Sequence, residues 1–162
     1  MIDRYGQILK LVPVLAPADI TSTDTNTALV DMANAHRCTF LVYTGSITSS
    51  STTAPVITLM AATGGATTSA TAIAFNYRKS SAITTDTWGD VTAATSSGVT
   101  VALTDDNKLF MIDVDPSVVA SKTDGRYVYL HIDTSATTTA LVVGASAMLE
   151  PRYAANTMIS SS

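Results

Sequence analysis

The segment Tyr127–Thr134 reads YVYLHIDT and alternates between two kinds of side chain. One face of the extended chain is apolar and carries Val128, Leu130 and Ile132. The other face carries Tyr127, Tyr129, His131 and Asp133. This period of two predicts a β-strand with one face in a core. The outward pair of tyrosines is typical of a contact surface, and a second buried face of a sandwich is the alternative interpretation.

Seven further segments have the length and residue types of strands. They are Gln7–Leu15, Cys38–Thr44, Pro55–Ala62, Ala70–Arg78, Val99–Thr104, Leu109–Val114 and Ala140–Leu149. Cys38–Thr44 is apolar on both faces, which predicts a strand in the middle of its sheet. Pro13 lacks a backbone N–H and therefore predicts an edge or a bend in the first strand. The short spacing of the segments favours a sandwich or barrel over βαβ units.

Turn residues predict how neighbouring strands connect. Pro55–Ala62 and Ala70–Arg78 flank a Gly-Gly turn and are predicted to form a hairpin. Val99–Thr104 and Leu109–Val114 flank residues 105–107, whose Asp and Asn side chains can bond their own backbone. We predict a second hairpin there.

One short helix and one long loop are also predicted. Asp115 followed by Pro116 is typical of a helix N-cap and first helical position, so Pro116–Lys122 is predicted to form one or two helical turns. Residues 79–97 are rich in Ser, Thr and Asp around Trp88. We expect a loop or an irregular sheet edge in that region.

The composition is that of an all-β protein. The 162 residues include 27 Thr and 17 Ser but only one Glu, and 14% of them are charged. Thr is favoured in strands, whereas Glu is favoured in surface helices. The length suits one domain. We therefore predict a single-domain antiparallel β-sandwich over residues 1–162, with the jelly roll as one candidate topology, and residues 1–10 and 151–162 as extended docking arms.

Charge and hydropathy exclude several partners. The net charge is −4, the sum of +1 over residues 1–81 and −5 over residues 82–162. Because phosphate binding needs a basic stripe, nucleic acid is not an expected partner. No apolar run approaches the ~20 residues of a membrane span, and the first ten residues lack the pattern of a signal peptide. Neither a membrane nor export is expected.

No constellation of residues fits a hydrolase. The segment 144–148 reads GASAM and ends in Met, where a nucleophile elbow needs Gly. Ser146 instead fits a small residue on a strand face. The only histidines are His36 and His131, which leaves few ways to assemble a catalytic triad. We expect no enzyme activity.

A partial calcium-loop pattern begins at Asp113. Asp115 and Ser117 follow at alternate positions, and Asp124 falls at the twelfth. However, Val118 occupies the sixth position, where such a loop needs Gly. A strand that ends in a capped helical turn accounts for the same residues, so we expect neither a metal nor another cofactor.

Seven aromatic and arginine side chains are candidate partner contacts, because such residues are enriched at interfaces, and all of them except Trp88 lie outside the hydroxyl-rich loops. They are Arg4, Tyr5, Trp88, Tyr127, Tyr129, Arg152 and Tyr153. Trp88 lies in a polar loop, where a tryptophan either caps the open end of a core or anchors a partner.

Five segments, in this order, carry a resemblance to a known family. They are LVPVLAP at 11–17, TWGDVT at 87–92, LFMIDVD at 109–115, RYVYL at 126–130 and LEPRYA at 149–154. The order of parts resembles the decoration, or cement, proteins of tailed-bacteriophage heads. The likeness covers nearly the whole chain, and it consists of hydrophobic patterns and turn residues.

The resemblance implies a structural virion protein that binds the outside of a phage capsid and cements the shell at junctions between major capsid proteins. Its partners would be the major capsid protein and further copies of itself, as a dimer or trimer. It would be made in the host cytoplasm and reside on the outer capsid surface. A phage tail or fibre module, or a carbohydrate-binding β-sandwich, is the alternative.

Overall fold

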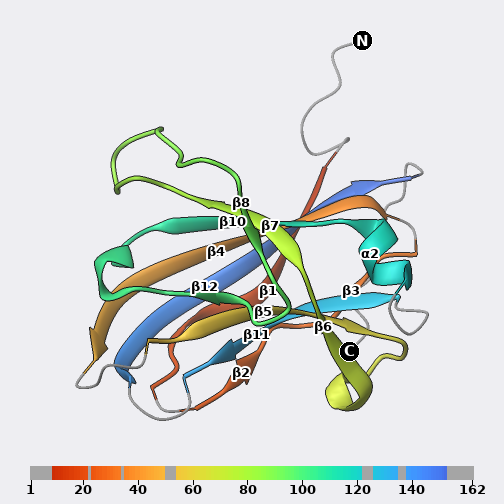
Figure 1. Cartoon of the computed structure of the whole chain (residues 1–162), viewed down its shortest axis with the longest axis horizontal. Coiled ribbons are helices and arrows are strands. Elements are labelled where there is room, and N and C mark those ends of the chain that lie inside the picture. The colour runs from red at the N-terminus through yellow and green to blue at the C-terminus, as the bar shows by residue number, and fades with distance from the viewer. Residues whose placement is uncertain are drawn as a thin grey trace.

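The structure, a computed structural model, is a sandwich of two antiparallel sheets (Figure 1). It describes residues 9–21, 23–33, 35–49, 54–121, 126–134 and 138–152. Within these ranges sheet A has the strand order β1 (Lys10–Asp19), β12 (Thr138–Pro151), β4 (Ala35–Ser49), β10 (Leu109–Val114), β7 (Phe75–Lys79) and β8 (Thr92–Ala94). Sheet B has the order β2 (Thr25–Asn26), β11 (Tyr127–Asp133), β5 (Val56–Ala62) and β6 (Ala70–Ile73), with β3 (Val30–Asp31) on β11 and β9 (Val99–Thr100) on β5. The predicted all-β sandwich is confirmed.

The strand pairs are nested inside one another, which is the topology of a jelly roll. The outermost pair is β1 with β12, followed by β2 and β3 with β11, then β4 with β10, and finally β5 with β6. Strands β7 and β8 lie between β6 and β10 in the sequence and extend sheet A beyond β10. Each sheet therefore combines strands from both halves of the chain.

The core lies between the two sheets. Its largest fully buried side chains include Phe40, Phe110, Ile112 and Leu141 from sheet A and Ile57, Leu59, Ile73, Leu130 and Ile132 from sheet B. Burying each such side chain contributes roughly 1.5–3 kcal/mol. The short helix α2 (Pro116–Ser121) lies at one end of the sandwich, where Val119 joins the core (Figure 1).

Two positional predictions are confirmed. Residues 38–44 lie in β4, between β12 and β10 in sheet A, as their apolar faces predict. Pro13 lies in β1, at the edge of the same sheet, and the register with β12 shifts between Pro13 and Leu15. Pro13 therefore marks an irregular edge strand, which disfavours pairing of that edge with another chain.

The predicted hairpin between Val99–Thr104 and Leu109–Val114 is wrong. The first segment is a strand only at β9, which pairs with β5 in sheet B, whereas β10 lies in sheet A. Between them, Leu103–Asp105 forms a single 3-10 turn. The polar residues at 105–107 do turn the chain, but the turn carries it from one sheet to the other.

A buried carboxylate holds this crossing in place. Asp105 has no exposed side-chain surface and accepts hydrogen bonds from Lys79 Nζ at 2.9 Å, Lys108 Nζ at 3.0 Å and the N–H of Ala102 at 3.0 Å. Burial alone would raise the pKa of Asp105, but the hydrogen bonds from Lys79, Lys108 and the Ala102 N–H, together with the charge of Lys79, outweigh burial and lower the pKa below its ordinary value. Thr44 Oγ1 also donates to the Asp105 carbonyl oxygen at 2.6 Å. These partners tie the turn to β4 and β7 rather than to β9.

The segment predicted as one strand at Ala70–Arg78 changes sheet at Ala74. Its first part, β6, pairs with β5 as the predicted hairpin requires. Its second part, β7, pairs with β10 and β8 in sheet A. Ile73 and Phe75 are both buried on either side of the break, so the core continues through the change of sheet. The hairpin prediction holds for β6 alone.

The capped helical turn is confirmed. Asp115 Oδ1 accepts hydrogen bonds from the N–H of Ser117 at 2.8 Å and from its hydroxyl at 2.7 Å. Helix α2 then begins at Pro116 and is described to Ser121, against the predicted end at Lys122. Lys122 and Asp124 lie outside the described residues.

Candidate interaction surfaces

The outer face of sheet A carries apolar side chains in contact with solvent. Cross-strand register aligns Leu11 with Met148, and aligns Leu41 with Met111 on the neighbouring strands. Leu11 is 64% exposed. We call the apolar residues of this face the sheet A patch: Leu11, Pro13, Leu41, Tyr43, Leu109, Met111 and Met148. Several apolar side chains thus gather on one face of a sheet, which marks a candidate interaction site.

Four charged residues border the sheet A patch, two of each sign. Arg37 on β4 lies opposite Glu150 on β12. Asp113 on β10 lies diagonally across from Arg78 on β7, where the Arg78 Nε is buried with no hydrogen-bond partner among the described residues. The border as a whole is therefore neutral and offers both signs of charge to a partner.

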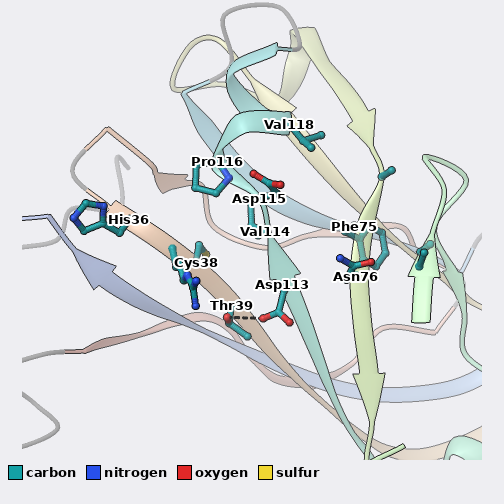
Figure 2. Close-up of a pocket in the computed structure, with 14 residues that line it drawn as sticks. His36, Cys38, Thr39, Phe75, Asn76, Asp113, Val114, Asp115, Pro116 and Val118 are labelled. Atoms are coloured by element: carbon teal, nitrogen blue, oxygen red, sulfur yellow. Dashed lines mark hydrogen bonds between the residues drawn. The ribbon is translucent and has the colours of Figure 1, made fainter. Parts of the chain in front are cut away.

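A groove of about 690 Å³ lies beside the patch, at the α2 end of sheet A (Figure 2). Its lining includes His36 and Arg37 from β4, Asn76 from β7 and Asp113 from β10. Figure 2 shows the Thr39 hydroxyl bonded to Asp113, at 2.8 Å. The groove is open and offers polar side chains of both charges.

The reactive groups of the groove have structural roles. Burial raises the pKa of the Cys38 thiol to about 12, and the nearby carboxylate of Asp113 adds to this effect, so the thiol stays protonated at neutral pH. Asp113 accepts the hydrogen bond from Thr39. Asp115 caps α2, and the hydrogen bond from the Ser117 side chain is the main cause of its lowered pKa. These residues can bind a polar partner, but the arrangement activates none of them as a nucleophile.

Residues 81–91 form a loop that projects from the sandwich between β7 and β8, at the upper left of Figure 1. Its base is built like a continued hairpin: Ser80 and Trp88 form a bridge, and the N–H of Gly89 donates to the Lys79 carbonyl at 2.9 Å. Near the tip, Ile83 is 56% exposed. The base thus holds an apolar side chain away from the body of the protein.

Trp88, predicted as a cap or an anchor, lies half-buried in the base of this loop. Two apolar residues of the same loop are more exposed than Trp88, namely Ile83 and Val91. Sequence reasoning singled out the tryptophan because a tryptophan in a loop is typical of interface hot spots, and it missed these two neighbours. Their signal in the sequence was an isolated apolar residue among Ser, Thr and Asp.

The outer face of sheet B is covered by this chain around Tyr129. Tyr129 is only 3% exposed and packs with Leu29 and Ala62, and burial raises its pKa. Tyr127 is half-buried, with the Arg126 guanidinium 5.2 Å from its ring centre. The second-buried-face interpretation therefore accounts for Tyr129, whose ring has little surface left for a partner.

The remaining candidate contacts belong to the terminal segments. Arg152 is exposed at the end of β12, and its Nε donates to the Ala35 carbonyl at 3.2 Å. Arg4, Tyr5 and Tyr153 lie outside the described residues, as do most of the predicted docking arms.

Ser146 lies within β12, opposite Leu41, as expected for a small residue on a strand. Over the described ranges, no group of three or more His, Cys, Asp or Glu side chains could hold a metal ion. In the same ranges, no helix is long and apolar enough to cross a membrane.

Comparisons with protein-family models, with curated proteins and with solved structures found no match to this chain.

Proposed function

We propose that this protein is a structural component of a phage particle, which binds the outside of the capsid and cements the shell at junctions between major capsid proteins. The observation that carries the proposal is the loop at residues 81–91, which presents Ile83 on a hydrogen-bonded base. An exposed apolar side chain held in one place loses little conformational freedom on docking. Such a side chain can fill an apolar recess on a partner.

The surface composition supports a role in surface burial. Exposed Ser, Thr and Ala lose little rotamer entropy on contact, whereas each immobilised Lys or Glu loses up to ~2 kcal/mol. The chain holds 44 Ser and Thr residues but only 14% charged residues. Repeated over one particle, weak contacts of this kind add up to a large total stabilisation. The partners we propose are the major capsid protein and further copies of this chain, on the outer surface of the virion.

Co-sedimentation with expanded phage heads that lack the protein tests this proposal. Wild-type protein should bind saturably, at a fixed ratio to capsid subunits, and raise the melting temperature of the heads. Ile83→Lys should weaken binding roughly tenfold, because it places a charge at an apolar anchor. Ala66→Lys is the matched control: it adds the same charge to an exposed loop next to β6 and should bind like wild type. Failure of the wild type to bind would refute the proposal.

Carbohydrate binding is a second candidate function, favoured by the groove at the α2 end of sheet A. Ligand sites combine a concave surface with a few convergent polar groups, and Asn76, Arg37 and Asp113 line this groove. A glycan array with the isolated protein tests this candidate. Binding that Asn76→Ala abolishes and Thr100→Ala preserves would replace the capsid proposal; an array without binding would reject the sugar site.

A further inference from the structure

The sheet A patch has the properties of a surface that binds itself. We propose that two copies of this chain pack through their sheet A patches, face to face about a two-fold axis. The proposal concerns a different surface from loop 81–91 and does not depend on capsid binding.

The size of the face fits a weak dimer. With one strand spacing allotted to each strand, the five strands from β1 to β7 cover a width of about 24 Å. With one rise allotted to each residue, residues 37–43 of β4 cover a length of about 23 Å. The footprint is then ~550 Å² per copy, or ~1,100 Å² for the pair. Stable specific interfaces begin at about 1,200 Å², so a dimer of this size lies just below that range, among weak and transient contacts. We expect association in the micromolar range rather than a permanent dimer.

The charges at the border favour a second copy over a strongly charged partner. Arg37 and Arg78 offer positive charge, while Asp113 and Glu150 offer negative charge. In a two-fold interface each residue meets the same surface of the other copy, so a border with equal numbers of both signs can pair with itself. The rest of the chain carries the net charge of −4 and would repel a second copy elsewhere.

Sheet geometry also favours contact through the face. The free edge of sheet A at β1 contains Pro13 and two register shifts, so it is a poor template for edge-to-edge pairing. A sheet face has no such obstacle, and two sheets stack at about 10 Å when their side chains interdigitate. Leu41 and Met111 lie side by side near the centre of the patch and would meet their counterparts there.

Sedimentation velocity over a concentration series tests the proposal. Wild-type protein should shift from monomer toward dimer as its concentration rises through the micromolar range. Leu41→Lys and Met111→Lys should each weaken the dimer roughly tenfold or more, because they place like charges across the axis. Ala66→Lys, which adds the same charge at an exposed position outside the patch, should dimerise like wild type. A monomer at every concentration, or equal dimerisation by all four proteins, would overturn the proposal.

Disulfide trapping gives an independent test that requires no loss of function. Ser146→Cys and Thr39→Cys, made singly, place a thiol beside Leu41 or Met148 on the proposed interface. The native Cys38 is buried and stays protonated, so it does not compete. Mild oxidation should link two copies of at least one of these variants, whereas Thr100→Cys in sheet B should stay monomeric. Linkage of Thr100→Cys alone would contradict the proposed face.

Discussion

Asp105 and the sheet A patch are opposite exceptions to the rule that charges face solvent and apolar groups are buried. Asp105 is fully buried, and its partners Lys79 and Lys108 come from its own chain. Leu11 and Tyr43 are large side chains that stay exposed on one sheet face. Folding pairs Asp105 with two lysines. It leaves Leu11 and Tyr43 in contact with solvent, and we propose that a second copy covers them. Changes at Asp105 should therefore alter the free energy of unfolding, whereas changes in the patch should alter binding.

The largest expected effect is at Asp105. Asp105→Asn removes the negative charge that compensates the two lysines. Breaking a fully buried ion pair costs about 3–5 kcal/mol, and we expect the lower end of this range because the side chains of Lys79 and Lys108 are partly exposed. Urea unfolding followed by circular dichroism measures the loss. Asp106→Asn is the matched control, because Asp106 is exposed and its side chain accepts a bond from the N–H of Ile47 that an amide oxygen can keep. A loss of similar size in both variants would show that the burial of Asp105 is unimportant.

Two tyrosines sharpen the contrast between covered and open faces. Tyr129→Ala empties a buried site on sheet B and should cost roughly 3 kcal/mol of unfolding free energy. Tyr43→Ala removes a ring that is 45% exposed on sheet A and should cost less than about 1 kcal/mol. If the two variants lose equal unfolding free energy in the same urea titration, Tyr43 is packed within the monomer as Tyr129 is, and the proposed contrast between the two faces is wrong.

A smaller effect is expected in the pH dependence of stability. The pKa of Asp105 is lowered in the folded state, so its carboxylate stabilises the fold above the unfolded pKa of about 3.9. That contribution is lost as the pH falls through the lower, folded value. The difference in unfolding free energy between wild type and Asp105→Asn should stay constant near neutral pH and narrow below about pH 4. A difference that widens with acidification would reverse the assigned direction.

Local patterns were enough to predict most of the longer strands. The alternation in residues 127–134 identified β11, and Pro13 identified an edge strand. Local patterns could not predict which sheet receives each strand. The Asp and Asn residues at 105–107 are good turn formers, but their destination depends on Lys79, which lies 26 residues earlier. The change of sheet at Ala74 likewise has no turn residue to mark it.

The candidate contacts were harder to predict for a related reason. Whether an apolar face is covered depends on distant segments, and the sequence of β11 does not reveal that Leu29 and Ala62 cover Tyr129. Both faces of residues 38–44 are apolar, which predicts a central strand. In a two-layer sandwich only one of these faces meets the core, and Leu41 and Tyr43 lie on the other. That excess of apolar residues was the available signal for the sheet A patch.

Methionine methyl NMR on a dilution series tests the central claim most directly, because the chain carries natural probes on both kinds of surface. Met111 and Met148 lie in the sheet A patch, Met60 packs against the Tyr129 cluster on sheet B, and Met32 is buried in the core. The account predicts concentration-dependent shifts at Met111 and Met148 and constant signals at Met60 and Met32. Constant signals at all four, or shifts at Met60 alone, would contradict it.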